Sequence, residues 1–167
     1  GYVRLVGMYP PERPAAKETW LTRLADQARR YEYEEITPAD EKPCEIVSMH
    51  IGQYSDAGDA QSELLGIQII RGFTASGSGG SAATPALLDP GDSAAGFSAE
   101  VNNTTVANTG TTATLHSDAF NVQAGYNYIP PIDARPKVNQ AQTSLVVRIT
   151  APADALTMNG TLIVREL

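Results

Sequence analysis

Two runs of alternating residues, joined by a short turn, decide the fold class of this chain. They are residues 143–150 (T-S-L-V-V-R-I-T) and residues 156–166 (L-T-M-N-G-T-L-I-V-R-E). In both runs apolar side chains recur at every second position, which is the period of a β-strand that packs one face on a core. Residues 151–155 (A-P-A-D-A) have the composition of a turn. The sequence therefore predicts an antiparallel pair of strands here.

The rest of the chain predicts more strands and no second fold class. The further candidates are residues 31–36, 44–54, 64–71, 84–88, 96–106, 111–122 and 126–129. Gly66 inside one of them suggests a bulge or the close approach of another backbone. No helical segments alternate with the strands, which argues against an α/β fold. We predict a mainly β domain over residues 32–167, an antiparallel β-sandwich or jelly roll of about eight strands.

Residues 1–31 have a different pattern, which predicts an N-terminal arm that contains one helix. A proline-rich segment at 10–14 gives an extended lead-in, and its last proline suits the first position of a helix. The helix is expected over about 15–30, because apolar residues recur there at helical spacing. The residues on that face, which form a candidate interface, are Trp20, Leu24, Ala28 and Tyr31. They would pack either on the chain's own sandwich or on a neighbouring subunit.

Charge is sparse in this sequence, and its balance is negative. Charged residues make up 19 % of the 167 residues, and the formal net charge is −7. Contact with nucleic-acid phosphates requires clustered cations, but only Arg29-Arg30 forms a cationic pair, and the acidic residues of 32–35 follow it. We therefore expect no direct binding of nucleic acid. A polar, uncharged surface is typical of proteins that lie against other subunits. We also expect no membrane span and no signal peptide, and hence synthesis in a reducing cytoplasm.

Few residues are candidates for catalysis. The single cysteine, Cys44, lies in an apolar run and is expected to be a buried structural thiol. The two histidines are His50, inside a candidate strand, and His116, which precedes Ser117 and Asp118. Adjacent strand residues point to opposite faces, and catalytic triads are usually assembled from distant segments. We therefore predict that the protein is not an enzyme and uses no cofactor.

Three acidic residues form a candidate metal site. Asp56, Asp59 and Glu63 lie within ten residues of each other, in a segment that also contains Gly58. Calcium prefers oxygen ligands on a flexible loop, but the pattern of an EF-hand is missing. The simpler interpretation, which we favour, is a connection in which the aspartates bind nearby backbone groups.

Two other segments are candidate ligand contacts. Tyr126 and Tyr128, with Trp20, could form an aromatic platform for a sugar or an interface. A rigid loop that packs at the rim of the sandwich is the favoured interpretation, because Pro130 and a second proline follow. The Gly/Ser-rich residues 74–83 predict a mobile loop, because no phosphate-binding glycine motif occurs there.

Several motifs together resemble those of a known family. They are residues 54–65, 69–72, 76–81, 100–105, 116–122 and 151–162. As a set they resemble a family of small proteins encoded by tailed bacteriophages and prophages, over roughly residues 44–167. Residues before about 31 depart from that pattern, which suggests that the arm is a specialised addition.

The resemblance implies a virion structural protein. Among such proteins, capsid decoration (cement) proteins with a β-sandwich fold fit the size and the strand content. The expected partners are then the major capsid protein and further copies of the chain in a homotrimer, on the capsid surface of a virion assembled in the host cytoplasm. The alternative is a carbohydrate- or receptor-binding jelly-roll module of a virion fibre, in which exposed Tyr126 and Tyr128 act with Asp56 and Asp59. A hydrolase built on His116 and Asp118 is the least favoured hypothesis.

Overall fold

The computed structural model describes residues 2–9, 30–38, 42–53, 63–139, 143–150 and 157–167. Their regular structure is almost entirely β, apart from one 3-10 turn, η1 (Ile132–Ala134). The strands are β1 (Tyr2–Tyr9), β2 (Arg30–Thr37), β3 (Cys44–Gln53), β4 (Leu64–Phe73), β5 (Ser81–Ala83), β6 (Ala86–Leu87), β7 (Ser98–Asn103), β8 (Ala113–Asn121), β9 (Tyr126–Tyr128), β10 (Lys137–Val138), β11 (Ser144–Thr150) and β12 (Met158–Glu166). Nowhere in these segments is there a helix with the length and hydropathy needed to cross a membrane.

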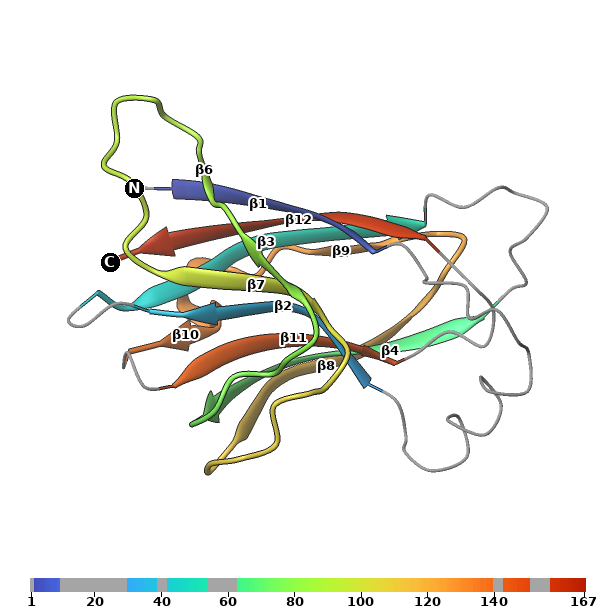
Figure 1. The fold of residues 1–167 in the computed structure, drawn as a ribbon. Coiled ribbons are helices and arrows are strands. Elements are labelled where there is room, and N and C mark those ends of the chain that lie inside the picture. Colours follow the sequence, from blue (N-terminus) through green and yellow to red (C-terminus); the bar gives the residue numbers. More distant parts are fainter. Residues whose placement is uncertain (1, 10–29, 39–41, 54–62, 140–142, 151–156) are drawn as a thin grey trace.

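The strands form two six-stranded antiparallel sheets (Figure 1). Sheet A has the order β10-β3-β12-β1-β6, with β9 also paired to β3, and sheet B has the order β5-β7-β2-β11-β4-β8. Consecutive strands often lie in different sheets: the chain crosses between the sheets from β1 to β2, β2 to β3, β3 to β4, β5 to β6, β6 to β7, β8 to β9, β10 to β11 and β11 to β12. The mainly β, antiparallel fold that the sequence predicts is therefore confirmed.

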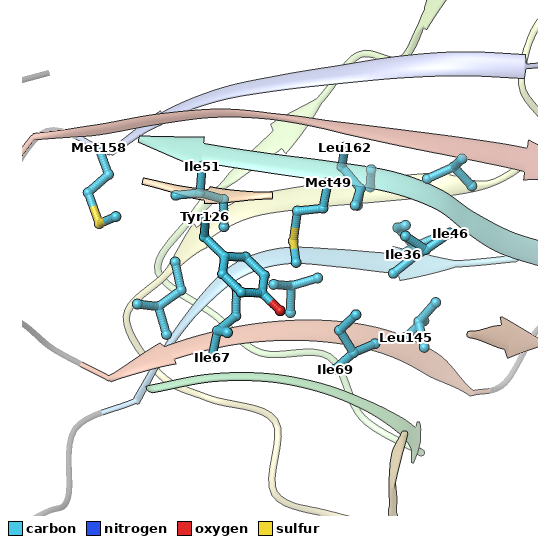
Figure 2. Close-up of a cluster of buried hydrophobic side chains, with 14 of the residues drawn as sticks. Ile36, Ile46, Met49, Ile51, Ile67, Ile69, Tyr126, Leu145, Met158 and Leu162 are labelled. Atoms are coloured by element: carbon cyan, nitrogen blue, oxygen red, sulfur yellow. The ribbon is translucent and has the colours of Figure 1, made fainter. Parts of the chain in front are cut away.

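One hydrophobic core joins the two sheets. Met49 and Ile51 enter it from sheet A, and Ile67 and Ile69 enter it from sheet B (Figure 2). All four side chains are buried. Their spacing of two residues follows from the strand period, which turns alternate side chains to the same face. Burial of an aliphatic side chain of this size contributes roughly 1.5–3 kcal/mol to folding.

A second, smaller cluster covers part of the opposite face of sheet B. Ile70 of β4 and Val146 of β11 pack there with Phe73 and with Ala107 from the connection between β7 and β8. The guanidinium of Arg148 lies 4.6 Å from the centroid of the Phe73 ring, and its Nη2 donates to the Ala107 carbonyl. This buried cation therefore holds the connection against the sheet.

The predicted hairpin is wrong, and the irregularity in the strand of Gly66 does not lie at Gly66. β11 and β12 do not pair with each other: β11 lies between β2 and β4 in sheet B, whereas β12 lies between β3 and β1 in sheet A. The residues between them therefore join two sheets, and they do not form a hairpin. Gly66 pairs in regular register with Ala119, and the irregularity of this ladder lies between Ile69 and Ile70.

The structure also adds a strand in the segment assigned to the arm. β1 pairs with β12 over eight residues, from Tyr2 opposite Arg165 to Tyr9 opposite Met158. Residues 2–9 are thus part of sheet A. The predicted helix over 15–30 lies outside the described residues, apart from Arg30 at the start of β2.

Candidate functional site

A polar seam joins the two sheets where β8 of sheet B faces β9 of sheet A. His116 Nε2 lies 2.5 Å from the Tyr126 hydroxyl, and that hydroxyl lies 3.3 Å from Asp118 Oδ2. The ring of His116 also packs on Tyr128, with centroids 4.3 Å apart. Because a carboxylate can only accept, the Tyr126 hydroxyl donates to Asp118, and His116 Nε2 donates to the Tyr126 oxygen.

Tyr126 is the centre of this seam. Its side chain projects from β9 between the sheets (Figure 2), and its ring packs on Phe120 with centroids 5.4 Å apart. Burial, and then the negative charge and hydrogen bond of Asp118, raise the pKa of Tyr126 to about 12. Burial also raises the pKa of Tyr128. Tyr126 therefore stays a neutral phenol at neutral pH, and it ties the sheets together.

The seam brings together residues that the sequence marked for different reasons. His116 and Asp118 were the candidate catalytic pair, and Tyr126 and Tyr128 were a candidate platform. The alternative of a sugar platform requires both rings to be exposed, but Tyr126 is buried and Tyr128 is half-buried. His116 contacts Asp118 only through the Tyr126 hydroxyl. Ser117, next to them in sequence, is instead hydrogen-bonded to Gln68, so this arrangement does not align a nucleophile with a base.

A second polar cluster surrounds Glu45 of β3. The carboxylate is 0 % exposed, and three cations contact it: Arg135 Nη1 at 2.8 Å, Arg165 Nη2 at 2.6 Å and Lys137 Nζ at 3.5 Å. Burial by itself raises the pKa of this carboxyl, but the hydrogen bond from Arg135 and the charges of Arg165 and Arg135 outweigh burial and lower the pKa. Glu45 is therefore a buried anion that fixes the positions of three cationic side chains.

A third polar cluster, around Glu35 of β2, fastens the Gly/Ser-rich segment to sheet B. The Glu35 carboxylate is 1 % exposed and accepts hydrogen bonds from the Ser144 hydroxyl at 2.6 Å and the Gly77 amide at 2.9 Å. Ser76 and Asn103 donate both to Glu35 and to Glu100. Residues 76 and 77 are thus held by side chains of sheet B, whereas the sequence predicts a mobile loop at this position.

The other predicted site residues divide into two groups. Trp20, Leu24, Ala28, Asp56 and Asp59 lie outside the described residues. Tyr31 lies in β2, where its backbone pairs with Ile149. Glu63 is half-buried, and its carbonyl accepts a hydrogen bond from the Val122 amide at 3.0 Å. Within the described segments, no group of three or more His, Cys, Asp or Glu side chains is placed to hold a metal ion.

Cys44 is the buried thiol that the sequence predicts. It is 0 % exposed and free, and its Sγ donates to the Lys42 carbonyl at 3.7 Å. Burial, and then the negative charge of Glu166, raise the pKa of the thiol to about 12. The thiol is therefore protonated and shielded at neutral pH.

We expect the folded protein to react with a disulfide reagent at pH 8 roughly a hundredfold or more slowly than the same chain unfolded in urea. The reason is that the reagent requires an exposed thiolate. The rate is measured by stopped-flow absorbance, as the thionitrobenzoate that Ellman's reagent releases when it reacts with Cys44. Equal rates in the folded and unfolded chain would contradict the buried position of Cys44.

Comparison with known proteins gives no further assignment: no protein-family model, curated protein or solved structure matches this chain.

Proposed function

We propose that this chain is a structural protein of a virion: a capsid decoration protein of a tailed bacteriophage, with a jelly-roll fold, that binds the lattice of the major capsid protein. The observation that carries the proposal is the order in which the strands pair. The set of motifs that resembles phage proteins, which is spread over roughly residues 44–167, adds a weaker argument from sequence. The proposed location is the outer surface of the capsid, and the proposed state is a homotrimer.

The strand pairing supports a jelly roll because the pairs are nested. β1 pairs with β12, β2 with β11, β3 with β9, and β4 with β8. The first and third of these pairs lie in sheet A, and the second and fourth lie in sheet B. Two four-stranded sheets built from four nested pairs are the pattern of a jelly roll, a fold used by viral capsid proteins and by lectin domains. The strands β5, β6, β7 and β10 are additions at the edges and sides of this framework.

The polar seam favours a structural role over the alternative of a glycan-binding fibre module. A sugar platform requires exposed aromatic faces, but Tyr126 is buried and Tyr128 is half-covered. The Tyr126 hydroxyl is also engaged within the chain, by His116 and Asp118. A glycan array distinguishes the two functions. We expect a decoration protein to bind none of the glycans, whereas a fibre module would bind some of them.

The direct test is to follow the protein during particle purification. Particles of the phage that encodes the chain are purified on a density gradient, and the protein is detected by mass spectrometry. We expect it to co-purify with filled heads at a stoichiometry set by the capsid lattice, and native mass spectrometry of the free protein is expected to give a trimer. Absence of the protein from purified particles would refute the proposal.

A deletion variant tests whether the segment around Trp20 is part of the interface with the capsid. Because β1 lies in sheet A, removing residues 1–31 would delete a strand of the fold. The variant should therefore replace only residues 10–29 with a short Gly/Ser linker and keep β1 and β2. We expect this variant to fold but to lose binding to heads that lack the wild-type protein. If the variant binds heads as tightly as the wild type, residues 10–29 are not part of the proposed interface.

A further inference from the structure

The cations around Glu45 form an organised positive surface on an acidic protein. Arg71 of β4 joins them, because its Nη1 donates to the Lys137 carbonyl at 3.0 Å. Arg135, Lys137 and Arg165 thus contact a single carboxylate, and Arg71 lies beside them through the backbone of Lys137. In the described part of the chain, no acidic side chain other than Glu45 forms an ion pair with Arg71, Arg135 or Lys137. Positive charge is therefore in excess here, although the whole chain carries a net charge of −7.

The positions of these cations are fixed by rigid structure. The Glu45 carboxylate, which is fully buried in β3, contacts Arg135 Nη1 and Lys137 Nζ. The backbone of the cationic segment is fixed as well, because Lys137 pairs with Glu45 across β10 and β3 and the Ile46 amide donates to the Pro136 carbonyl at 3.0 Å. Side chains that are ordered before binding lose less conformational entropy when a ligand arrives.

The cluster remains open to solvent despite this order. The side chain of Lys137 is 43 % exposed, and that of Arg135 is 16 % exposed. Arg71 is exposed. An ammonium group has three donors and a guanidinium has five. The exposed cations Lys137 and Arg71 therefore have further donors for an external acceptor, whereas Arg135 is mostly buried and helps to position Lys137 through their shared contact with Glu45.

From this geometry we infer that Arg71, Arg135 and Lys137 form a docking site for an acidic segment of a partner protein. Carboxylates fit because they accept paired hydrogen bonds from guanidinium groups. A nucleic-acid strand fits poorly, because its long phosphate backbone would approach a chain with a net charge of −7. The identity of the partner rests on the proposed function: an acidic segment exposed on the capsid lattice. The site itself does not depend on that function.

Matched charge variants of the full chain test the inference. Arg71→Gln and Lys137→Gln each remove one positive charge from the cluster. Lys42→Gln removes one exposed positive charge elsewhere and is the control. The probe is a fluorescent peptide of eight glutamates at low ionic strength, with a peptide of eight glutamines as the neutral control. Thermal unfolding of each variant verifies that it is folded.

We expect each cluster variant to weaken binding of the glutamate peptide about threefold, and the double variant about tenfold. Lys42→Gln should leave binding unchanged, and salt should weaken wild-type binding. Equal losses in all variants would overturn the inference, because net charge alone would then explain binding. Equally tight binding of the glutamine peptide would also overturn a site for acidic protein segments. So would displacement of the glutamate peptide by inorganic phosphate at the same concentration as the peptide.

The same variants separate this inference from the proposed function. If the double variant binds heads as tightly as the wild type, the capsid lattice is refuted as the partner of this site and the decoration role stands. If the wild-type protein is absent from virions but binds the glutamate peptide through Arg71 and Lys137, the decoration role is refuted and the acidic-segment site stands.

Discussion

Glu45→Ala will lower the free energy of unfolding by about 3–5 kcal/mol. The substitution removes the only carboxylate that contacts Arg135 and Lys137 in the described structure, and it leaves the mostly buried guanidinium of Arg135 without its compensating charge. Breaking a buried ion pair by removing one partner costs more than the pair itself contributes, because the remaining charge has lost its compensation. Urea denaturation followed by circular dichroism measures the change.

A control and a pH series make this prediction specific. Asp133→Asn also removes one carboxylate, but from the exposed turn η1, and should change stability by no more than about 0.5 kcal/mol. The folded pKa of Glu45 lies below the ordinary value of 4.5, so its stabilisation is complete above that value and is lost as the pH falls through the folded pKa. The stability difference between wild type and Glu45→Gln should therefore be constant near pH 7 and shrink well below pH 4.5. A difference that grows in acid would contradict this account.

Glu35→Gln will destabilise the protein by about 1–3 kcal/mol and loosen the segment at residues 76 and 77. The carboxylate accepts from the Gly77 amide and from the Asn103 side chain through the same oxygen, Oε2. A glutamine NH₂ group at the Oε2 position would face two donors. At the Oε1 position it would force the hydroxyls of Ser76 and Ser144 to change from donating to accepting. Hydrogen exchange of the Gly77 amide, together with urea denaturation, measures both effects.

Glu100→Gln is the matched control for this substitution. Glu100 is only half-buried and shares two of the same donors, Ser76 and Asn103. Water can replace some of its hydrogen bonds, so we expect a smaller loss of stability than for Glu35→Gln. If the two variants unfold at the same urea concentration, burial of Glu35 is not the source of its effect.

The strands of this protein could be predicted because period-2 alternation is a local property. The boundaries of β3, β4, β11 and β12 differ from the predicted ones by at most two residues. Strand partners could not be predicted, because pairing depends on which sheet each strand joins, and no local pattern records that choice. β1 was missed because its sequence, Y-V-R-L-V-G-M-Y, has apolar residues at positions of both parities.

The polar clusters were only partly predictable, for a similar reason. His116 and Asp118 are separated from Tyr126 by the turn after β8, so their meeting depends on how the two sheets face each other. The Glu45 cluster did carry a local signal: a charged residue between Cys44 and Ile46, both of which are buried. A charge within a buried strand requires a partner. Its cations, however, come from segments 90 and 120 residues further along the chain.

The central place of β12 in sheet A has a consequence for biosynthesis. This strand follows all the others in the chain, yet it separates β3 from β1 and pairs with both. Until the ribosome has released residues 158–166, β1 lacks its eight-residue pairing partner and β3 lacks one of the strands with which it pairs. Such distant pairing slows folding. We therefore expect nascent chains to depend on chaperones until β12 has left the ribosome, and chains that are cut short before β12 to aggregate.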